Sequence, residues 1–218
     1  EAPVLASALI HSATLVSAGI YLIGRVYPYL CTSNFIFVVF IWSSFTAFYG
    51  GLIAAYQTDL KRILAYSTIS HCGLLFVSLC LNNIFITLIY LHFHGWFKSL
   101  SFMCAGNIIG KSHNYQDFRK MGNMTSINLL DFFVIILSLS SLASLPFFIG
   151  FFNKHYLLLL LNNSFFFLIP SVFILLASIT GIFYSLKLLN GVFWGIYKSP
   201  FFYNFNFLNS IEKNNIFI

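Results

Sequence analysis

The chain has 218 residues, of which 59% are hydrophobic and only 7% are charged. A soluble domain carries about 25% charged residues, so this composition excludes a water-soluble protein and predicts an integral membrane protein. The net charge of +6 comes from basic residues in short loops, which indicates membrane topology rather than nucleic-acid binding. The cysteines form no CxxC pair and no Cys/His metal spacing, so we expect no metal or cofactor in this chain.

Six apolar segments are long enough to cross a bilayer, which takes about 20 residues of α-helix. We therefore expect an all-α, polytopic membrane protein. The predicted spans are residues 4–27, 35–56, 62–81, 84–110, 128–161 and 165–196. Residues 1–196 then form one transmembrane helical bundle, and residues 197–218 form a polar and aromatic tail.

Two of the spans are predicted to be broken. The span 128–161 is too long for one crossing, and Pro146 and Gly150 should interrupt it. The span 84–110 is also long, and Gly95 lies beside polar residues, where a break would admit water. Broken helices in membranes occur where protein or water satisfies the freed backbone groups, and in transporters they mark the path of the ion or substrate.

The loops predict the orientation. If the spans alternate, the loops 56–62 and 111–127 and both chain ends fall on one side, and Arg25 is the only basic loop residue on the other. The basic residues of the first side are Lys61, Arg62, Lys111, Arg119, Lys120, Lys198 and Lys213. By the positive-inside rule this side faces the cytoplasm or the mitochondrial matrix.

Ionisable residues gather in the segment "LHFHGWFKSLSFMCAG", residues 91–106. Tyr90, His94 and Lys98 are spaced i, i+4, i+8 and share one helix face, whereas His92 points roughly the opposite way. A lysine at the centre of a bilayer costs at least about 2.5–3.5 kcal/mol, so it needs a partner or water. A histidine one turn away titrates near neutral pH and can pass a proton on. Lys98 and His94 are therefore candidates for proton transfer; the alternative is that Lys98 snorkels to an interface and His94 bonds a carbonyl.

Three further candidates follow the same logic. His11 lies among small residues that favour close helix packing, so a structural and a functional role are both open. Lys154 follows the predicted break and is a candidate for an internal site, with His155 beside it.

Other ionisable residues have simpler explanations. Lys61 fits a positive-inside anchor, Lys187 fits either snorkelling or function, and His71 is expected to be a packing residue. Carboxylates are scarce: Asp59, Asp117 and Glu212 lie in loops, and Glu1 and Asp131 lie at predicted helix starts. A path of Lys and His without an internal acid is incomplete. The sequence has no phosphate loop, catalytic triad or metal cluster on which soluble-type enzyme chemistry could rest.

Several motifs resemble subunit 5 of NADH:ubiquinone oxidoreductase, respiratory complex I. "EAPVLASALIHSATLVSAGIYLI" is similar to the family's "EGPTPVSALIHAATMV-AG", and "QTDLKRILAYSTISHCGLLF" to "DLKR-LAYST-SQ-G". "HGWFKSLSFMCAGNIIG" resembles "HAFFKALLFL-AG", "YQDFRKMGNM" resembles "QDIRKMGGL", and "SLASLPFFIGFFNKH" resembles "SLAG-PFL-GFYSKD". The motifs are collinear and cover most of the chain. Subunits 4 and 2 and the Mrp-type antiporter subunits share this fold; "EAPV" and "SH" are closer to subunit 4, and "HGWFK" and "GFFNK" favour subunit 5.

The resemblance implies half of an antiporter-like inverted-repeat fold that moves protons along a central hydrophilic axis. The family's axis residues match His11, Lys61, His94, Lys98 and Lys154. Two positions depart from the family: its further histidine, one turn before His94, is Tyr90 here, and the acid after its last lysine is His155. His92 can partly substitute for the missing histidine. The family's usual arginine is replaced by Lys187, which keeps the charge.

The resemblance also implies partners and a location. NAD, FMN, iron–sulfur clusters and ubiquinone belong to other subunits of the complex, and the location is the mitochondrial inner membrane, with the basic loops and both ends in the matrix. We expect other membrane-arm subunits, a subunit-4-like neighbour and membrane lipids as partners, and no nucleic acid. The family's first repeat, which carries a Glu/Lys pair, precedes the matched region. Either this sequence is a fragment of a longer chain, or the subunit is split and a second chain supplies that repeat; we expect the split subunit. The alternatives are an Mrp-type Na⁺/H⁺ antiporter subunit and a structural subunit that does not pump.

Overall fold

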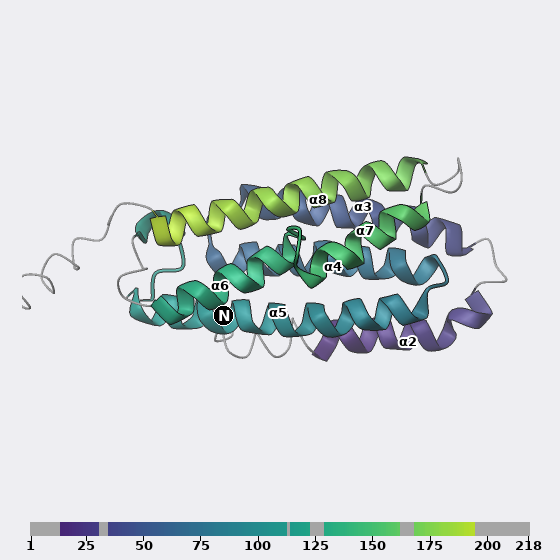
Figure 1. Ribbon diagram of the computed structural model, residues 1–218, viewed down its shortest axis with the longest axis horizontal. Helices are drawn as coiled ribbons and strands as arrows, with labels where there is room; N and C mark the ends of the chain where they lie inside the picture. Colours follow the sequence, from purple (N-terminus) through teal and green to yellow (C-terminus); the bar gives the residue numbers. More distant parts are fainter. Residues whose placement is uncertain (1–13, 31–34, 113, 123–128, 162–167, 195–218) are drawn as a thin grey trace, which may run out of the picture.

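The computed structural model describes residues 14–30, 35–112, 114–122, 129–161 and 168–194. These residues form a bundle of helices along one long axis; successive helices run in opposite directions, except that α7 continues the direction of α6 (Figure 1). The helices are α2 (Leu15–Leu30), α3 (Phe35–Tyr56), α4 (Leu60–Cys80), α5 (Ile84–Lys111), α6 (Leu129–Leu142), α7 (Ile149–Leu161) and α8 (Leu168–Leu189), with a 3-10 turn η2 (Phe118–Lys120) and a π-helical turn η5 (Asn190–Trp194). The predicted all-α fold is confirmed.

The predicted spans correspond closely to these helices. The spans 35–56, 62–81 and 84–110 are α3, α4 and α5. Three helical segments of the described chain are long and apolar enough to cross a membrane, namely α3, α4 and residues 168–194, so the predicted number of six is not established. The start of the span 4–27, with His11, and the tail 197–218 lie outside the described residues.

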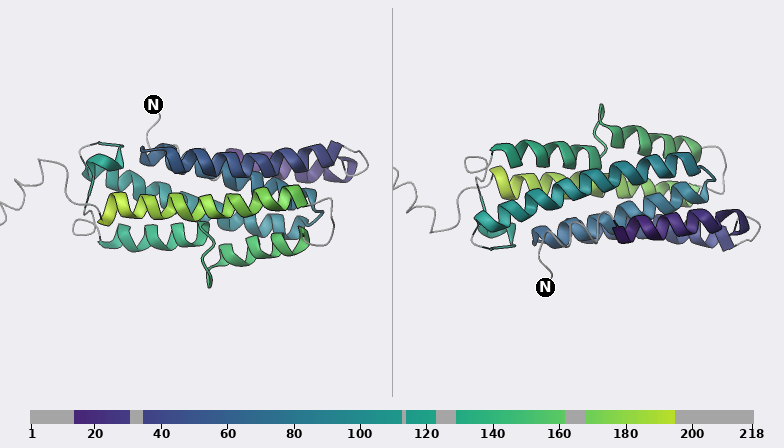
Figure 2. Two further views of the ribbon diagram at one scale, coloured as in Figure 1. Left: turned by 90° about the horizontal axis from the view of Figure 1, so that it is seen from above. Right: turned by 90° about the horizontal axis from the view of Figure 1, so that it is seen from below.

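The predicted break near Pro146 is present. Helix α6 ends at Leu142 and α7 begins at Ile149, and the link between them projects from the side of the bundle (Figure 2). Ser144 and Phe147 in this link have positive φ angles of 58° and 74°, which are uncommon for residues other than glycine. The backbone of α7 then returns so close to α6 that a Cβ on Gly150 would lie 1.8 Å from the Ser141 carbonyl oxygen. Only glycine fits at this contact.

The second predicted break is wrong. Helix α5 is continuous from Ile84 to Lys111, through Gly95. One interior glycine costs a helix only about 1 kcal/mol. An unsatisfied backbone group in the hydrocarbon costs several kcal/mol, so the helix keeps its hydrogen bonds across this position. Water therefore does not reach the polar residues through an opening in α5.

Glycines allow α3 and α4 to pack closely. A Cβ on Gly73 of α4 would lie 2.6 Å from the Ala47 amide nitrogen, and one on Gly50 of α3 would lie 2.8 Å from the Ser70 amide nitrogen. Helices in membranes often associate through small residues, because backbone contact replaces the hydrophobic driving force that lipid removes. The backbones of α3 and α4 are therefore in close contact along one side of the bundle.

The interior consists of a polar layer between two apolar clusters. One cluster joins Leu64 of α4 to Phe102 of α5 and Tyr184 of α8, and the other joins Leu74 of α4 to Tyr90 of α5 and Leu157 of α7. The segments between these clusters carry buried polar side chains, which we call the polar layer. They are Ser67, Ser70, His71, His94, Lys98, Ser101, Ser138, Ser141, Asn153 and Lys154.

The α3–α4 contact gives a first prediction. Gly73→Ala places a methyl group against the backbone of α3 and should destabilise the subunit by about 1–3 kcal/mol, the usual cost of overpacking. The matched control is Gly95→Ala, because no atom lies within 4 Å of the position of its Cβ. We expect a lower thermal unfolding temperature in the detergent-solubilised protein for the first variant only. Equal temperatures for the two variants would contradict the close packing.

Candidate functional site

Lys98 lies at the centre of the polar layer. Its side chain is 0% exposed, and its Nζ donates hydrogen bonds to Ser67 Oγ and to the Leu64 carbonyl oxygen on α4, the latter at 3.5 Å. Ser67 and Leu64 are one turn apart on the α4 face that packs against α5. Lys98 therefore points into the bundle rather than snorkelling, and its acceptors are neutral oxygen atoms.

His94 and His71 face each other across the α4–α5 contact. Their ring centroids are 5.3 Å apart, and both side chains are buried. His71 Nδ1 lies 2.8 Å from the Tyr90 hydroxyl, and its Nε2 lies 3.4 Å from the Tyr184 hydroxyl of α8. Neither ring nitrogen of His94 has a hydrogen-bond partner among the described residues. His94 therefore keeps a free site for a proton.

Lys154 reaches the same layer from the broken helix. It is 6% exposed, and its Nζ donates a 2.9 Å hydrogen bond to the carbonyl oxygen of Leu142, the last residue of α6. The final carbonyls of a helix have no partner within the helix and carry partial negative charge. The break thus creates the acceptor that the buried ammonium needs.

A small cavity joins these groups. Its lining includes His71, Tyr90 and His94, and also Asn153 and Lys154. Its size suits about one water molecule. The Asn153 Nδ2 is buried without a hydrogen-bond partner in the described part of the chain. Polar groups from α4, α5 and α7 thus line one small cavity.

No acid balances the lysines within the described residues. Neither Lys98 nor Lys154 is in an ion pair there; the observed pairs are Arg62–Asp59 at 3.2 Å and Arg119–Asp117 at 2.8 Å, both with partly exposed side chains. The buried Asp131 accepts a hydrogen bond from Asn107 Nδ2 instead. The described chain also holds no group of three or more His, Cys, Asp or Glu side chains placed to bind a metal.

Two candidates do not join the polar layer. His92 is exposed on the far side of α5, where its Nδ1 lies 3.2 Å from the Leu88 carbonyl oxygen, as the helix geometry predicts. His155 is exposed beside Lys154 and stacks on Phe151, with ring centroids 5.4 Å apart. Because α7 turns His155 outward, it does not occupy the place of a charge partner for Lys154.

Lys61 and Lys187 lie at the basic end of the bundle. Lys61 is the second residue of α4, one turn before Leu64, and is partly exposed. Lys187 Nζ donates to the carbonyl oxygens of Ala55 at 2.6 Å and Gln57 at 2.9 Å, at the end of α3. Lys187 therefore caps the C-terminal end of α3 and does not enter the polar layer.

The loops at this end are joined by backbone contacts. Asp59 and Asp117 form an isolated antiparallel bridge, and Leu60 N donates to the Gln116 carbonyl oxygen at 3.0 Å. Hydrogen bonds from the Arg119 side chain lower the pKa of the Asp117 carboxyl. The described basic residues of these loops lie at one end of the bundle, because the start of α4, the end of α5, η2 and the C-terminal end of α8 lie together, whereas α2, which carries Arg25, lies toward the other end (Figure 1).

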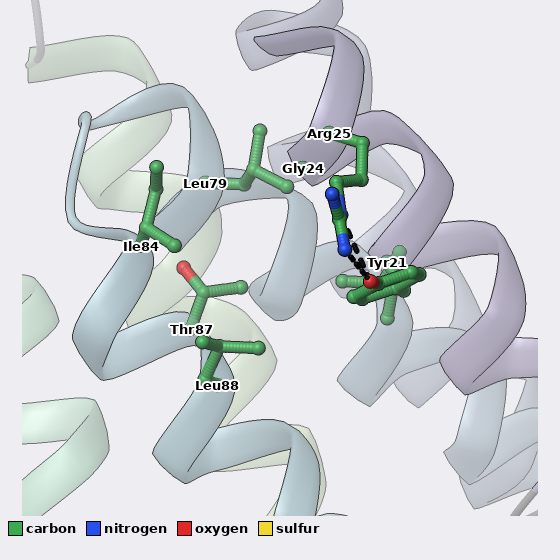
Figure 3. A pocket seen from close by; sticks show the side chains of 8 residues that line it. Tyr21, Gly24, Arg25, Leu79, Ile84, Thr87 and Leu88 are labelled. Carbon is green, nitrogen blue, oxygen red and sulfur yellow. Dashed lines mark hydrogen bonds between the residues drawn. The ribbon is translucent and has the colours of Figure 1, made fainter.

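An apolar groove lies near the other end, between α2 and the α4–α5 hairpin. It has a volume of about 190 Å³, and its walls include Gly24, Leu79 and Leu88 (Figure 3). Arg25 at its edge donates from Nε to the Tyr21 hydroxyl at 2.8 Å. The groove is separate from the polar layer, with which it shares no lining residue.

Sequence reasoning missed His71, which is a hydrogen-bonded member of the polar layer rather than a packing residue. It also missed Tyr184 and Ser67, which contact His71 and Lys98. One signal was available: Ser67, Ser70 and His71 lie on the serine-rich stretch "AYSTISHCG" of an otherwise apolar span. A helix with polar residues on one face inside a membrane turns that face inward.

The contacts of Lys187 give a second prediction. Lys187→Met removes two hydrogen bonds from a charged donor to the end of α3 and should cost about 1–2 kcal/mol of stability. Lys187→Arg, the matched control, retains the charge and the donors. Thermal unfolding of the detergent-solubilised protein should separate the two variants, with the lower temperature for Lys187→Met. Equal unfolding temperatures of the two variants would contradict the structural role.

Comparisons with known proteins give the family. The family model described as NADH:quinone oxidoreductase/Mrp antiporter, TM matches residues 1–185. A protein named NADH-ubiquinone oxidoreductase chain 5 from Paramecium tetraurelia is 49% identical over 87% of this chain and 33% of its own length. Proteins of the same name from Trichophyton rubrum and Mus musculus are 32% and 37% identical, over 100% and 71% of this chain and 33% and 26% of their own lengths.

The fold is also found in a solved structure. A chain of the Mrp complex from Dietzia sp. DQ12-45-1b has a TM-score of 0.74 and 23% identity, over 80% of this chain and 33% of that one. The present chain spans about a third of the length of the relatives from Paramecium tetraurelia and Trichophyton rubrum. The family match over residues 1–185 and the shared helical architecture lead to one conclusion: this chain belongs to the NADH:quinone oxidoreductase/Mrp antiporter transmembrane family.

Proposed function

We propose that this chain is a proton-translocating part of the membrane arm of respiratory NADH:ubiquinone oxidoreductase, in the mitochondrial inner membrane. Its relatives named NADH-ubiquinone oxidoreductase chain 5 support this assignment. Lys98, His94 and Lys154 carry the protons across the polar layer. Lys61 lies on the route toward the basic end, and His11, which is outside the described residues, extends the route by resemblance alone.

The observation that carries the proposal is the enclosure of Lys98 and Lys154 among neutral acceptors. A lysine held by a carboxylate has its charge fixed by that partner. A buried lysine that bonds only to hydroxyl and carbonyl oxygens has a charged form that is costly to maintain. Such a group can exchange its proton when a neighbouring charge changes, and His94, with free ring nitrogens, is a neighbour that can receive one.

The remainder of the assembly supplies what this chain lacks. Electron transfer, with NAD, FMN, iron–sulfur clusters and ubiquinone, takes place in other subunits, and this chain performs no redox step itself. Its partners are other membrane-arm subunits, including a subunit-4-like neighbour and a chain with the amino-terminal half of subunit 5, together with membrane lipids. A carboxylate from such a neighbour would offset the positive charge of the lysines at a distance, without holding either of them in an ion pair. The basic end faces the matrix by the positive-inside rule.

The third prediction tests the two lysines. Lys98→Met and Lys154→Met keep the length and apolar body of the side chain but remove the proton-carrying group. In assembled complex within inner-membrane vesicles, each variant should lower the number of protons moved per NADH oxidised, or slow both processes together. The measurement is the initial rate of vesicle acidification against the rate of NADH oxidation. NADH oxidation by a water-soluble artificial acceptor reports assembly of the electron-transfer part.

Lys120→Met is the matched control, because Lys120 is exposed in the loop at the basic end. This variant should leave the number of protons moved per NADH oxidised unchanged. Unchanged ratios at unchanged rates of NADH oxidation in fully assembled Lys98→Met and Lys154→Met complexes would support a structural subunit and overturn the proposal. Proton movement that occurs only when Na⁺ moves in the opposite direction would instead identify an Mrp-type antiporter subunit.

A further inference from the structure

The apolar groove between α2 and the α4–α5 hairpin takes no part in the polar layer, and its walls indicate what it can hold. Ile84 and Leu88 on α5 are 43% and 42% exposed, so in the described part of the chain the groove is open to the surroundings of the bundle. Its volume of about 190 Å³ is below the roughly 300–1,000 Å³ of pockets that enclose a whole small molecule. The groove therefore suits one part of a longer molecule.

The hydroxyl groups of the walls are already engaged within the protein. The Thr87 hydroxyl donates to the Asn83 carbonyl oxygen at 2.9 Å and lies 2.9 Å from Ser78 Oγ. The Tyr21 hydroxyl accepts a hydrogen bond from Arg25. The other wall residues, apart from Arg25, are glycine, leucine and isoleucine. A molecule that lies along these walls is held by van der Waals packing, which favours a hydrocarbon chain.

Arg25 gives the groove one charged edge. Its side chain lies on the side of α2 that faces the hairpin, with the guanidinium carbon 5.1 Å from the centre of the Tyr21 ring (Figure 3). Its Nε and Nη2 donate to the Tyr21 hydroxyl, and a guanidinium has five N–H donors in all. Within the described residues no carboxylate pairs with it, because the ion pairs there are those of Arg62 and Arg119. Tyr21 therefore positions a cation that retains donors for an anion.

The charged edge and the apolar walls follow one another along the bundle axis. Arg25 precedes Leu30, the last residue of α2, by five positions, which is roughly 7–8 Å along a helix. The walls continue inward from this end, to Ile20 on α2 and to Leu88, one turn beyond the start of α5. In a bilayer the polar headgroups lie outside the hydrocarbon core. The order of charge and hydrocarbon in the groove is therefore that of a phospholipid in the leaflet opposite the basic loops.

We propose that this groove binds a phospholipid with a net negative headgroup, with its phosphate on the Arg25 guanidinium and one acyl chain along Gly24, Leu79 and Leu88. The planar guanidinium fork matches phosphate oxygen atoms. The lining contains no carboxylate that could hold the ammonium of a zwitterionic headgroup, so a net negative lipid is preferred. The site is independent of the proposed function, because it depends on the outer end of the bundle and not on the lysines of the polar layer.

The fourth prediction concerns the lipid that reaches the groove. The protein, purified with the subunits that accompany it, is placed in phosphatidylcholine vesicles with a trace of phosphatidylglycerol that carries a photoreactive diazirine in one acyl chain. After illumination, mass spectrometry of the peptides should find the lipid on Leu79, Ile84 and Leu88. Excess unlabelled phosphatidylglycerol should suppress this labelling, and photoreactive phosphatidylcholine should label the same residues less.

Four variants separate the charge from the groove. Arg25→Gln keeps donors but removes the charge and should lower the labelling about fivefold, whereas Arg25→Lys should retain the preference for phosphatidylglycerol. Gly24→Leu should abolish the labelling, because a Cβ there lies 3.8 Å from Leu79 Cδ1 and the rest of the new side chain fills the groove. Gly19→Leu is the matched control: it lies on α2 outside the groove, no atom is within 4 Å of its Cβ position, and labelling should not change.

Thermal unfolding shows which variants are folded, and if Arg25→Gln is not, Gly24→Leu with its control decides. Equal labelling by the two photoreactive lipids would indicate ordinary boundary lipid and overturn the inference. Labelling that persists in folded Gly24→Leu or undiminished in folded Arg25→Gln would overturn it as well. Absence of lipid from the groove residues of the unaltered protein would show that a polypeptide segment fills the groove, which also overturns the inference.

Discussion

A buried ammonium in a lipid-embedded bundle must be given oxygen atoms by the protein, and this demand explains most of the interior. Lys98 takes its acceptors from a serine and a carbonyl of α4, so α5 must face the polar stripe of α4. Lys154 takes its acceptor from the end of α6, so α6 and α7 must be separate helices. Each lysine therefore fixes the position of a neighbouring helix. Breaking one of these contacts would leave a charge without compensation, which costs more than the contact itself contributes.

The fold was largely predictable because a membrane leaves few alternatives. Apolar segments of the required length must be helices, since the backbone has no other partner in lipid. The interruption near Pro146 followed from residue chemistry, and the shared face of Tyr90, His94 and Lys98 followed from the helical repeat. The continuity of α5 did not follow: the tendency of glycine to interrupt helices, familiar from water, is outweighed in hydrocarbon by the cost of exposing backbone groups.

The remaining features of the site depend on which helices meet. His71 is one polar residue in an apolar span when read along the chain, and it acquires two tyrosine partners only when α4 is packed against α5 and α8. Likewise, Lys187 reaches carbonyl oxygens more than a hundred residues earlier in the sequence. A one-dimensional pattern tells which face of a helix is polar. It does not tell which partner that face meets, because the crossing of helices is set by close packing at small residues such as Gly73.

The hydrogen bond from Lys154 to Leu142 links a charge to a backbone shape. The ammonium is attracted to the partial negative charge at the end of α6, so its proton is held differently when the two half-helices shift relative to each other. By thermodynamic reciprocity, gain or loss of that proton must change the balance between arrangements of the break by the same free energy. In the interrupted helix, the occupancy of Lys154 by a proton and the alignment of the two helical segments are therefore variables of one equilibrium.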